Sequence, residues 1–201
     1  MGQFHTAPFF RGGVMFPDIH KILLSKSNAI IAIDGCCAAG KTTLAKKIAD
    51  EFGMQIIHTD DFFLPFEMRT HERLDTAGGN FHYERFIEEV CGGIISGKPF
   101  EYRVFSCKTG NYDETVTVDP QKPIIVEGAY SLHPEIPDIY DVKIFMSVDY
   151  ETQLERILER NGKDALEVFR SKWIPFENRY FDAFGIKDKC DIVIEKVRDI
   201  P

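Results

Sequence analysis

The chain has little of what several classes of protein require. Its 201 residues hold 24 Lys and Arg against 32 Asp and Glu, a net charge of −8. A general nucleic-acid binder carries an excess of basic residues, so the composition argues against that partner. The longest apolar runs, such as residues 29–33, fall far short of the roughly 20 residues that span a bilayer. We therefore expect no membrane partner either.

Cysteine is also scarce and is not arranged as a framework. The five cysteines are odd in number and scattered, at Cys36, Cys37, Cys91, Cys107 and Cys190, which does not suggest paired disulfides. The first thirty residues hold no continuous apolar segment followed by a small-residue cleavage site, so we expect no secretory signal. These absences favour a cytoplasmic protein. We find no internal repeat.

What the chain does have is an alternation of apolar segments with helical patterns. Continuous apolar runs at 29–34, 54–60, 123–128, 141–149 and 190–195 are typical of strands buried on both faces. Two polar alternating segments, 101–107 and 114–119, predict a small antiparallel addition. The pattern predicts an α/β fold of three layers, with a mainly parallel sheet of about five strands and helices on both faces. We expect one domain over residues 29–201, preceded by an extension and a short helix within residues 1–28.

A phosphate-binding motif follows the first of these strands. Residues 35–43 read GCCAAGKTT, which matches G-x-x-x-x-G-K-[ST] between a strand and a helix. In such a loop the backbone curls so that successive N–H groups point at phosphate oxygens, and the helix adds its positive end. We expect Lys41 to reach the β- and γ-phosphates and the Thr42 hydroxyl to bind Mg²⁺. The predicted nucleotide-binding residues are Gly35, Cys36, Cys37, Ala38, Ala39, Gly40, Lys41, Thr42 and Thr43.

The two adjacent cysteines occupy free positions of that motif. Only small side chains are needed there, and cysteine behaves as a small apolar residue, so we interpret Cys36 and Cys37 as spacers. The alternative is that the helix N-terminus and Lys41 lower a thiol pKa and make the loop oxidisable.

Acidic residues end two further apolar segments. Asp60 and Asp61 close the second and Glu127 closes the third, so parallel strands would bring them to the edge that carries the phosphate loop. Mg²⁺ on a triphosphate takes one or two carboxylates, and an acceptor hydroxyl needs a carboxylate to orient or take its proton. We assign Glu127 to the metal and Asp60 to the acceptor. Solvated or helix-capping acids are the alternative, and Asp61 is the more ambiguous of the pair.

Two arginines and one long connection complete the candidate site. Arg156 and Arg160 lie four apart on a helix predicted to end at Gly162, which suits a clamp on a transferring phosphoryl group. A solvated helix face is the alternative. The connection over residues 64–80 shows no clear period, and its Arg69, His71 and Arg73 could meet an acceptor or lie in solvent. The histidines show no metal-ligand spacing, so we propose no zinc site.

The order of these segments resembles the uridine kinase-like family of P-loop kinases, whose relatives include phosphoribulokinase and bacterial pantothenate kinase. The resemblance rests on IDGCCAAGKTTLA, HTDDFFLP, GGNFHYERF, PIIVEGAYSLHP, RILERNG and CDIVI, over roughly residues 29–195. It implies a P-loop NTPase-type fold with a small helical lid, and ATP and Mg²⁺ as cofactors. It also implies transfer of the γ-phosphoryl group to a hydroxyl of a small metabolite. The family's acceptor-orienting acid matches Asp60, its metal-associated glutamate matches Glu127, and its lid arginines match Arg156 and Arg160.

Two departures from the family concern the acceptor. Val104-Phe105-Ser106 stands where uridine kinases carry Tyr-Asp, and His82 stands where they carry an aspartate. The acceptor therefore stays open between a nucleoside and a non-nucleoside such as pantothenate, glycerate or a sugar phosphate. An ATP-binding switch without a metabolite substrate is a third reading. The oligomeric state is also open, a homo-oligomer included.

Overall fold

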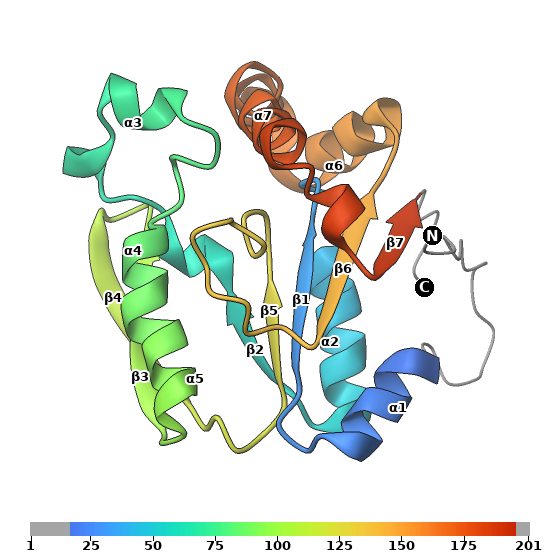
Figure 1. The fold of residues 1–201 in the computed structure, drawn as a ribbon. Helices are drawn as coiled ribbons and strands as arrows, with labels where there is room; N and C mark the ends of the chain where they lie inside the picture. Colours follow the sequence, from blue (N-terminus) through green and yellow to red (C-terminus); the bar gives the residue numbers. More distant parts are fainter. Residues whose placement is uncertain (1–16, 196–201) are drawn as a thin grey trace.

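The computed structural model describes residues 17–195, and its centre is a parallel sheet of five strands (Figure 1). The strands lie in the order β2-β5-β1-β6-β7. Their bounds are β1 Ile30–Gly35, β2 Gln55–His58, β5 Ile124–Glu127, β6 Val142–Ser147 and β7 Ile192–Glu195. The five apolar segments thus form the sheet that the sequence predicts, and the α/β class is confirmed.

Both faces of the sheet are covered, which explains the continuous apolar runs. Successive residues of a strand face opposite sides, so Ile31 and Ile33 pack on one face while Ile30 packs on the other. The first face carries α1 (Pro17–Ser25) and α2 (Lys41–Phe52). Ile19 of α1 is fully buried in that core. The expected extension over residues 1–16 lies outside the described residues.

The second face carries one helical segment in three joined pieces. These are α4 (Tyr83–Phe86), the π-helical turn η3 (Ile87–Cys91) and α5 (Gly92–Ser96). Glycine lowers helix propensity, yet the helix continues through Gly93. A larger residue would not fit there, because a Cβ would lie 2.2 Å from the ring of Phe100. The missing side chain lets the helix and the strand that follows it approach closely.

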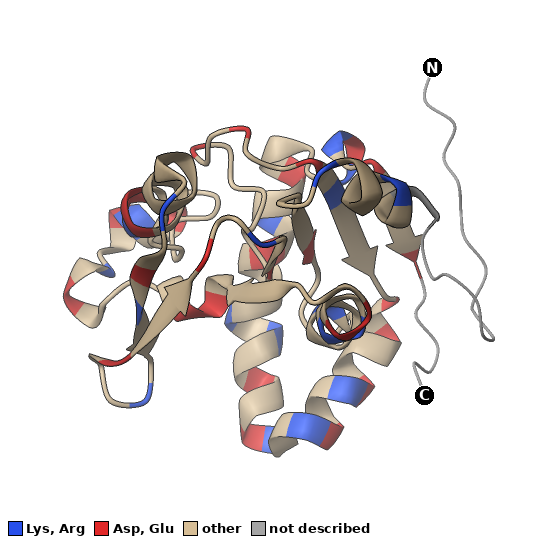
Figure 2. Ribbon diagram, turned by 90° about the horizontal axis from the view of Figure 1, so that it is seen from below, with Lys and Arg blue, Asp and Glu red and all other residues tan. Residues whose placement is uncertain are grey.

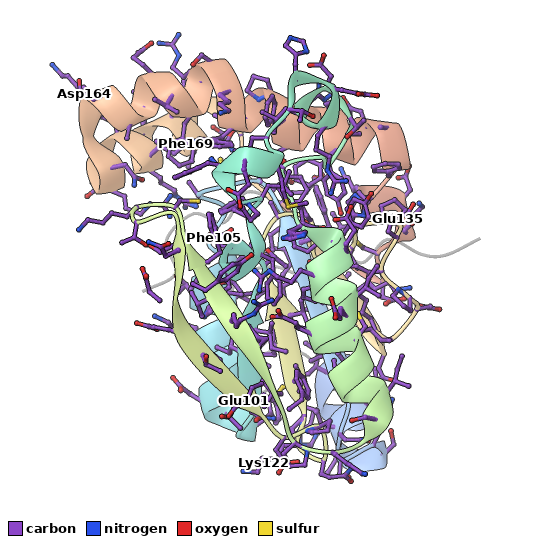
Figure 3. All side chains as sticks on the ribbon, turned by 90° about the vertical axis from the view of Figure 1, so that its left-hand side faces the viewer. Glu101, Phe105, Lys122, Glu135, Asp164 and Phe169 are labelled. Atoms are coloured by element: carbon purple, nitrogen blue, oxygen red, sulfur yellow. The ribbon has the colours of Figure 1, made fainter. Side chains whose placement is uncertain are left out.

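A two-stranded antiparallel hairpin lies beside this helix, as predicted. It consists of β3 (Phe100–Ser106) and β4 (Asn111–Val118). Tyr102 and Val118 point into the core while Glu101 is exposed. The register shifts between Val104 and Phe105, so Phe105 is also buried. Figure 3 shows the hairpin below the lid, with Glu101 and Phe105 labelled.

A helical lid lies beyond the carboxyl ends of the strands (Figure 1). It consists of α6 (Tyr150–Val168), the π-helical turn η4 (Phe169–Trp173) and α7 (Ile174–Phe184). The first helix ends at Gly162 as predicted, because the backbone there leaves the helical region, at φ 82° and ψ 176°. A second helix follows directly across this kink, and α6 spans both. Pro175 lies in the first turn of α7, directly after the π-helical turn η4.

The connection over residues 64–80 is more ordered than its sequence pattern suggests. It contains the 3-10 turn η2 (Phe66–Met68) and the short helix α3 (His71–Asp75). The hydroxyl of Thr70 accepts the backbone N–H of Arg73 and caps α3. Each piece is only one turn long, so neither produces a visible period. Two further 3-10 turns are η1 (Thr59–Phe62) and η5 (Lys187–Lys189).

Charge of both signs is spread along the same helices, as Figure 2 shows. Within residues 17–195 no helix is both long enough and apolar enough to cross a membrane.

Candidate functional site

The phosphate loop joins β1 to α2, and its backbone needs two of its glycines. Gly35 has φ +133°, and a Cβ there would lie 1.9 Å from the carbonyl oxygen of Met146 on β6. Gly40 has φ +98° and begins α2 in the left-handed region. Ala38 also has a positive φ, of 58°. The turn is therefore compact, and the first turn of α2 opens above the sheet with its N–H groups unpaired by the helix.

Lys41 lies across the inside of this loop. Its Nζ donates to the carbonyl oxygens of Gly35 at 2.7 Å and of Cys36 at 2.9 Å. The side chain is 9% exposed, so a compact positive charge is held next to the loop amides. That arrangement suits an anion with several oxygens.

A pocket of about 640 Å³ opens over the loop and extends under the lid. It contains both ends of the expected reaction, the phosphate loop and the strand-end carboxylates. Its lining residues are Cys37, Ala38, Gly40, Lys41, Thr42, Thr43, Asp60, Phe63, Asn80, Cys107, Glu127, Gly128, Ala129, Tyr130, Arg156, Arg160, Phe169, Trp173 and Glu177. Of the predicted loop residues, Gly35, Cys36 and Ala39 do not line it.

Glu127 and Thr42 form an oxygen pair at one side of the pocket. The Thr42 hydroxyl donates to Oε1 of Glu127 at 3.0 Å, and Nδ1 of His58 lies 2.6 Å from the same oxygen. Burial acts to raise the pKa of Glu127, but the hydrogen bond and charge of His58, with Lys41 and Thr42, hold it below its usual value. The hydrogen bond that His58 makes to Glu127 in turn raises the pKa of His58. Glu127 is therefore kept as an anion.

The two adjacent aspartates of η1 have different environments. Asp60 lines the pocket; it is open to the cavity but enclosed by protein, and this enclosure raises its pKa, while Lys41 and Arg160 oppose the shift. Asp61 turns toward the hairpin, where its Oδ2 accepts the hydroxyl of Tyr102 at 3.1 Å. Only Asp60 can meet a molecule in the pocket.

The lid brings both predicted arginines to the pocket. Arg156 donates from Nη1 to the carbonyl oxygen of Ala38 at 3.2 Å. Arg160 is exposed, and its Nε donates to Asn161 at 2.8 Å. Both precede the kink at Gly162, whose added Cβ would meet nothing within 4 Å. The arginines thus lie on the part of α6 that contacts the phosphate loop.

A third pocket carboxylate, Glu177, was not anticipated from the sequence. Its Oε2 accepts the backbone N–H of Cys37 at 2.8 Å. Gln153 of α6 donates to the carbonyl oxygen of the same cysteine at 3.0 Å. The signal for Glu177 was its place on α7, where Ile174, Tyr180 and Phe181 are the other buried residues. An acid on the apolar face of a helix requires a polar partner.

One part of the pocket wall is aromatic. Phe63 and Trp173 stack with ring centroids 6.3 Å apart, and Phe169, Tyr130 and Asn80 also line the pocket. Figure 3 shows Phe169 on the underside of the lid, toward the hairpin, and Asp164 at the lid's outer end. These residues come from four separate segments, so no local pattern predicted the wall.

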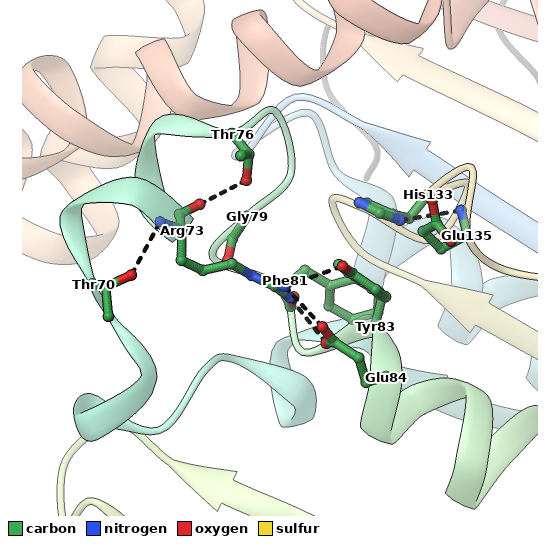
Figure 4. A network of polar contacts seen from close by, with 9 residues as sticks. All are labelled: Thr70, Arg73, Thr76, Gly79, Phe81, Tyr83, Glu84, His133 and Glu135. Atoms are coloured by element: carbon green, nitrogen blue, oxygen red, sulfur yellow. Dashed lines mark hydrogen bonds and ion pairs between the residues drawn. The ribbon is translucent and has the colours of Figure 1, made fainter.

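The basic residues of the 64–80 connection do not line the pocket. Arg73 is held by the carboxylate of Glu84, the hydroxyl of Tyr83 and the carbonyl oxygens of Gly79 and Phe81 (Figure 4). His71 pairs with Asp75 at 2.7 Å on the surface. Arg69 donates to the carbonyl oxygen of Leu64 and to Sγ of Cys107, which does line the pocket. Of the three, only Arg69 comes near the site.

The environment of the loop cysteines opposes reactive thiols. Burial raises the pKa of Cys36 to about 11, and burial together with Glu177 raises the pKa of Cys37 further. The oxidisable-loop alternative needs a lowered thiol pKa, which is the opposite of the direction found at both cysteines. That both cysteines are spacers stays a prediction.

Comparison with known proteins assigns the family. A model of the phosphoribulokinase/uridine kinase family matches residues 30–200. The chain belongs to this family. Its members are P-loop kinases, so the expected class of activity, a phosphotransferase, is confirmed.

Individual relatives agree with this assignment. The uridine kinase of Bacillus velezensis is 26% identical over 190 residues, covering 85% of this chain and 87% of that protein. Uridine-cytidine kinase 2-B of Danio rerio is 25% identical over 195 residues, covering 85% and 74%. A solved structure described as a possible uridine kinase, from Bacillus stearothermophilus, has a TM-score of 0.64 at 18% identity and covers 88% of this chain and 95% of that chain. It shares the fold.

Proposed function

We propose that the chain transfers the γ-phosphoryl group of ATP to a hydroxyl of a small metabolite, and that this acceptor is a nucleoside. The observation that carries the proposal is the position of Asp60 in the same pocket as Lys41 and Thr42. An acceptor-facing carboxylate beside a phosphate loop is what phosphoryl transfer needs and what a nucleotide switch does not.

The donor half of the site fits ATP with Mg²⁺. The loop amides and Lys41 would hold the phosphates, and the hydroxyl of Thr42 with the carboxylate of Glu127 would hold the metal. The donor set agrees with this ion, since Mg²⁺ prefers oxygen ligands and Glu127 is kept ionised. When bound, the ion neutralises charge on the phosphates.

The acceptor half depends on Asp60 and the lid arginines. Asp60 lines the pocket, so its carboxylate would be in position to accept the proton of the acceptor hydroxyl. Arg156 and Arg160 would stabilise the charge of the transferring group from α6. Most of the rate enhancement would come from positioning and electrostatics.

The shape and charge of the pocket favour an uncharged acceptor with a ring. Its aromatic wall includes Phe63, Phe169 and Trp173, whereas its lining cations are Lys41, Arg156 and Arg160. Lys41 and Arg156 each bond the phosphate loop, and Arg160 acts on Asp60. Arg69 contacts the lining residue Cys107 but does not itself line the pocket. A carboxylate or phosphate on the acceptor would therefore find no lining cation beyond these three. This supports a nucleoside over pantothenate, glycerate or a sugar phosphate, in line with the names of the relatives.

A cytoplasmic location for the protein stays a prediction.

The test is acceptor-stimulated ADP release with nucleosides, pantothenate, glycerate and sugar phosphates. Asp60→Asn should reduce turnover by roughly 10²–10⁴-fold with ATP affinity largely kept, and Lys41→Ala should nearly abolish it. The matched control is Asp61→Asn, the neighbouring acid that faces Tyr102 instead of the pocket. Tight ATP binding without stimulation by any acceptor would favour the switch. Equal losses in both aspartate variants would remove Asp60 from its role.

A further inference from the structure

Glu177 places a carboxylate against the phosphate loop itself. Its Oε2 lies 2.8 Å from the backbone nitrogen of Cys37, and the residue is 8% exposed. The N–H groups of such a loop are anion-binding groups. In the described structure, one of them is therefore already occupied by an anion-forming side chain of the protein.

Glu177 cannot easily leave when another anion arrives. It belongs to the buried side of α7 together with Ile174, Tyr180 and Phe181. The loop residue that it contacts is also held from α6, because Gln153 donates to the carbonyl oxygen and to Sγ of Cys37. Because Glu177 is 8% exposed, its carboxylate can leave the loop only by turning into the packed surroundings of α7 or by a shift of that helix.

The groups around Glu177 act on its pKa in opposite directions. Burial raises the pKa of Glu177 to about 7, Lys41 and the hydrogen bonds with Cys37 act against that shift, and Asp60 adds to it. Several titratable and charged groups face Glu177 or share its pocket. They are Lys41 of α2, Asp60 of η1, Cys36 and Cys37 of the loop, Cys107 after β3, Glu127 of β5, Tyr130 after β5, and Arg156 and Arg160 of α6. Polyphosphate in the pocket would add several negative charges to this set.

We propose that Glu177 is a further nucleotide-binding residue, which takes up one proton from solvent when the phosphates enter and then holds a phosphate oxygen as a neutral acid. The proton moves from the buffer to the carboxylate, and the O–H that results donates to the phosphate oxygen. No covalent bond of the nucleotide changes. The inference rests on the proposed function, because it needs a nucleotide at the loop.

The physical reason is repulsion between two anions in a poorly hydrated site. A carboxylate held next to phosphate is relieved either by displacement or by protonation, and the anchoring of α7 favours protonation. A purely structural Glu177, which only ties α7 to the loop, would stay ionised and would bind no proton. The two roles therefore differ in a measurable quantity.

The experiment counts protons taken up on binding. Calorimetric titration of the full chain with Mg²⁺ and the β,γ-imido analogue of ATP is done at pH 8 in buffers of different ionisation enthalpy. Wild type is compared with Glu177→Gln, whose amide oxygen can still accept the Cys37 N–H, and with Asp60→Asn. The wild type should take up roughly 0.5–1 proton more than Glu177→Gln, and Asp60→Asn should keep that excess. Comparing variants with one ligand removes the ligand's own ionisation.

The affinity should show the same linkage. Between pH 7 and 9 the wild-type Kd should rise by up to about tenfold per pH unit relative to Glu177→Gln, with the two converging near pH 6. Equal proton counts in these two proteins, or an excess lost in Asp60→Asn alone, would overturn the inference and leave the proposed function standing. Absence of nucleotide binding in the wild type would overturn both. If Glu177→Gln does not fold, the wild type is measured alone. The inference is then refuted if the wild type takes up no more protons on binding than the ionisation of the ligand itself predicts.

Discussion

Tyr180→Phe removes the hydroxyl that holds the buried carboxylate beneath the phosphate loop. Asp34 is fully buried; its Oδ1 accepts the N–H of Gly35 at 2.7 Å, and its Oδ2 accepts the N–H of Leu132 at 3.0 Å and the Tyr180 hydroxyl at 2.8 Å. Burial raises the pKa of Asp34, but all three partners are donors, as an ionised carboxylate requires. The bond from Tyr180 is thus a charge-assisted one.

The magnitude follows from that class of bond. Hydrogen bonds to charged groups contribute about 1.5–3 kcal/mol to stability, so the free energy of unfolding should fall by that amount. For a chain of this size the corresponding fall in Tm is roughly 3–12 °C. The hydroxyl is small and the ring remains, so little of the loss comes from a cavity.

The assay is urea unfolding at pH 7, with Tyr140→Phe as the matched control. The Tyr140 hydroxyl donates to the uncharged carbonyl oxygen of Ser131 at 2.7 Å, and its loss should cost only about 0.5–1.5 kcal/mol. The dependence of the unfolding free energy on urea should be unchanged in both variants. If Tyr180→Phe costs no more than Tyr140→Phe, Asp34 is not ionised and the reasoning fails.

Three further outcomes are expected. Gly35→Ala should destabilise the chain by more than about 2 kcal/mol and impair nucleotide binding, because its Cβ would overlap a carbonyl oxygen of β6; wild-type melting and nucleotide titration would contradict this. The double variant Cys36→Ala/Cys37→Ala should lose activity in peroxide at the wild-type rate, since both thiol pKa values are raised; slower loss would restore the oxidisable-loop reading. In EDTA, protonated His58 should stabilise the fold at pH values below its unfolded pKa of about 6.5. This stabilisation should be lost as the pH rises through the raised pKa of His58 in the folded protein. The difference in unfolding free energy between wild type and His58→Gln should therefore shrink from pH 6 to pH 9. A pH-independent difference would refute the contact with Glu127 as its cause.

The parts of the site that the sequence predicted are those set by contiguous residues. The loop motif is local, because Gly35, Gly40, Lys41 and Thr42 act within one turn of chain. The strand-end acids Asp60 and Glu127 were predictable because parallel strands end at a common edge. In the fold, β2 and β5 are neighbours, with His58 opposite Glu127 in their register.

The parts that it did not predict depend on where the lid comes to rest. Trp173 and Phe169 read as ordinary helical aromatics, and only the packing of the lid over η1 brings them near Phe63. Phe176, Tyr180 and Phe184 repeat every four residues, but the buried residues of α7 are Ile174, Glu177, Tyr180 and Phe181. The aromatic spacing therefore does not point to Glu177.

The three carboxylates of the pocket, Glu127, Asp60 and Glu177, differ in the direction of their pKa shifts, and this difference separates their proposed roles. His58, Lys41 and Thr42 hold the pKa of Glu127 down, so it is an anion fit for a cation at any physiological pH. At Asp60 and Glu177 burial outweighs the groups that oppose it, Lys41 among them, and raises both pKa values. Groups whose environments push their pKa values apart mark different tasks in one site. A raised pKa makes Asp60 a better acceptor for the hydroxyl proton, and it lets Glu177 meet phosphate without a charge. The proposed roles thus place a cation, a polyanion and a hydroxyl in one pocket without like charges in contact.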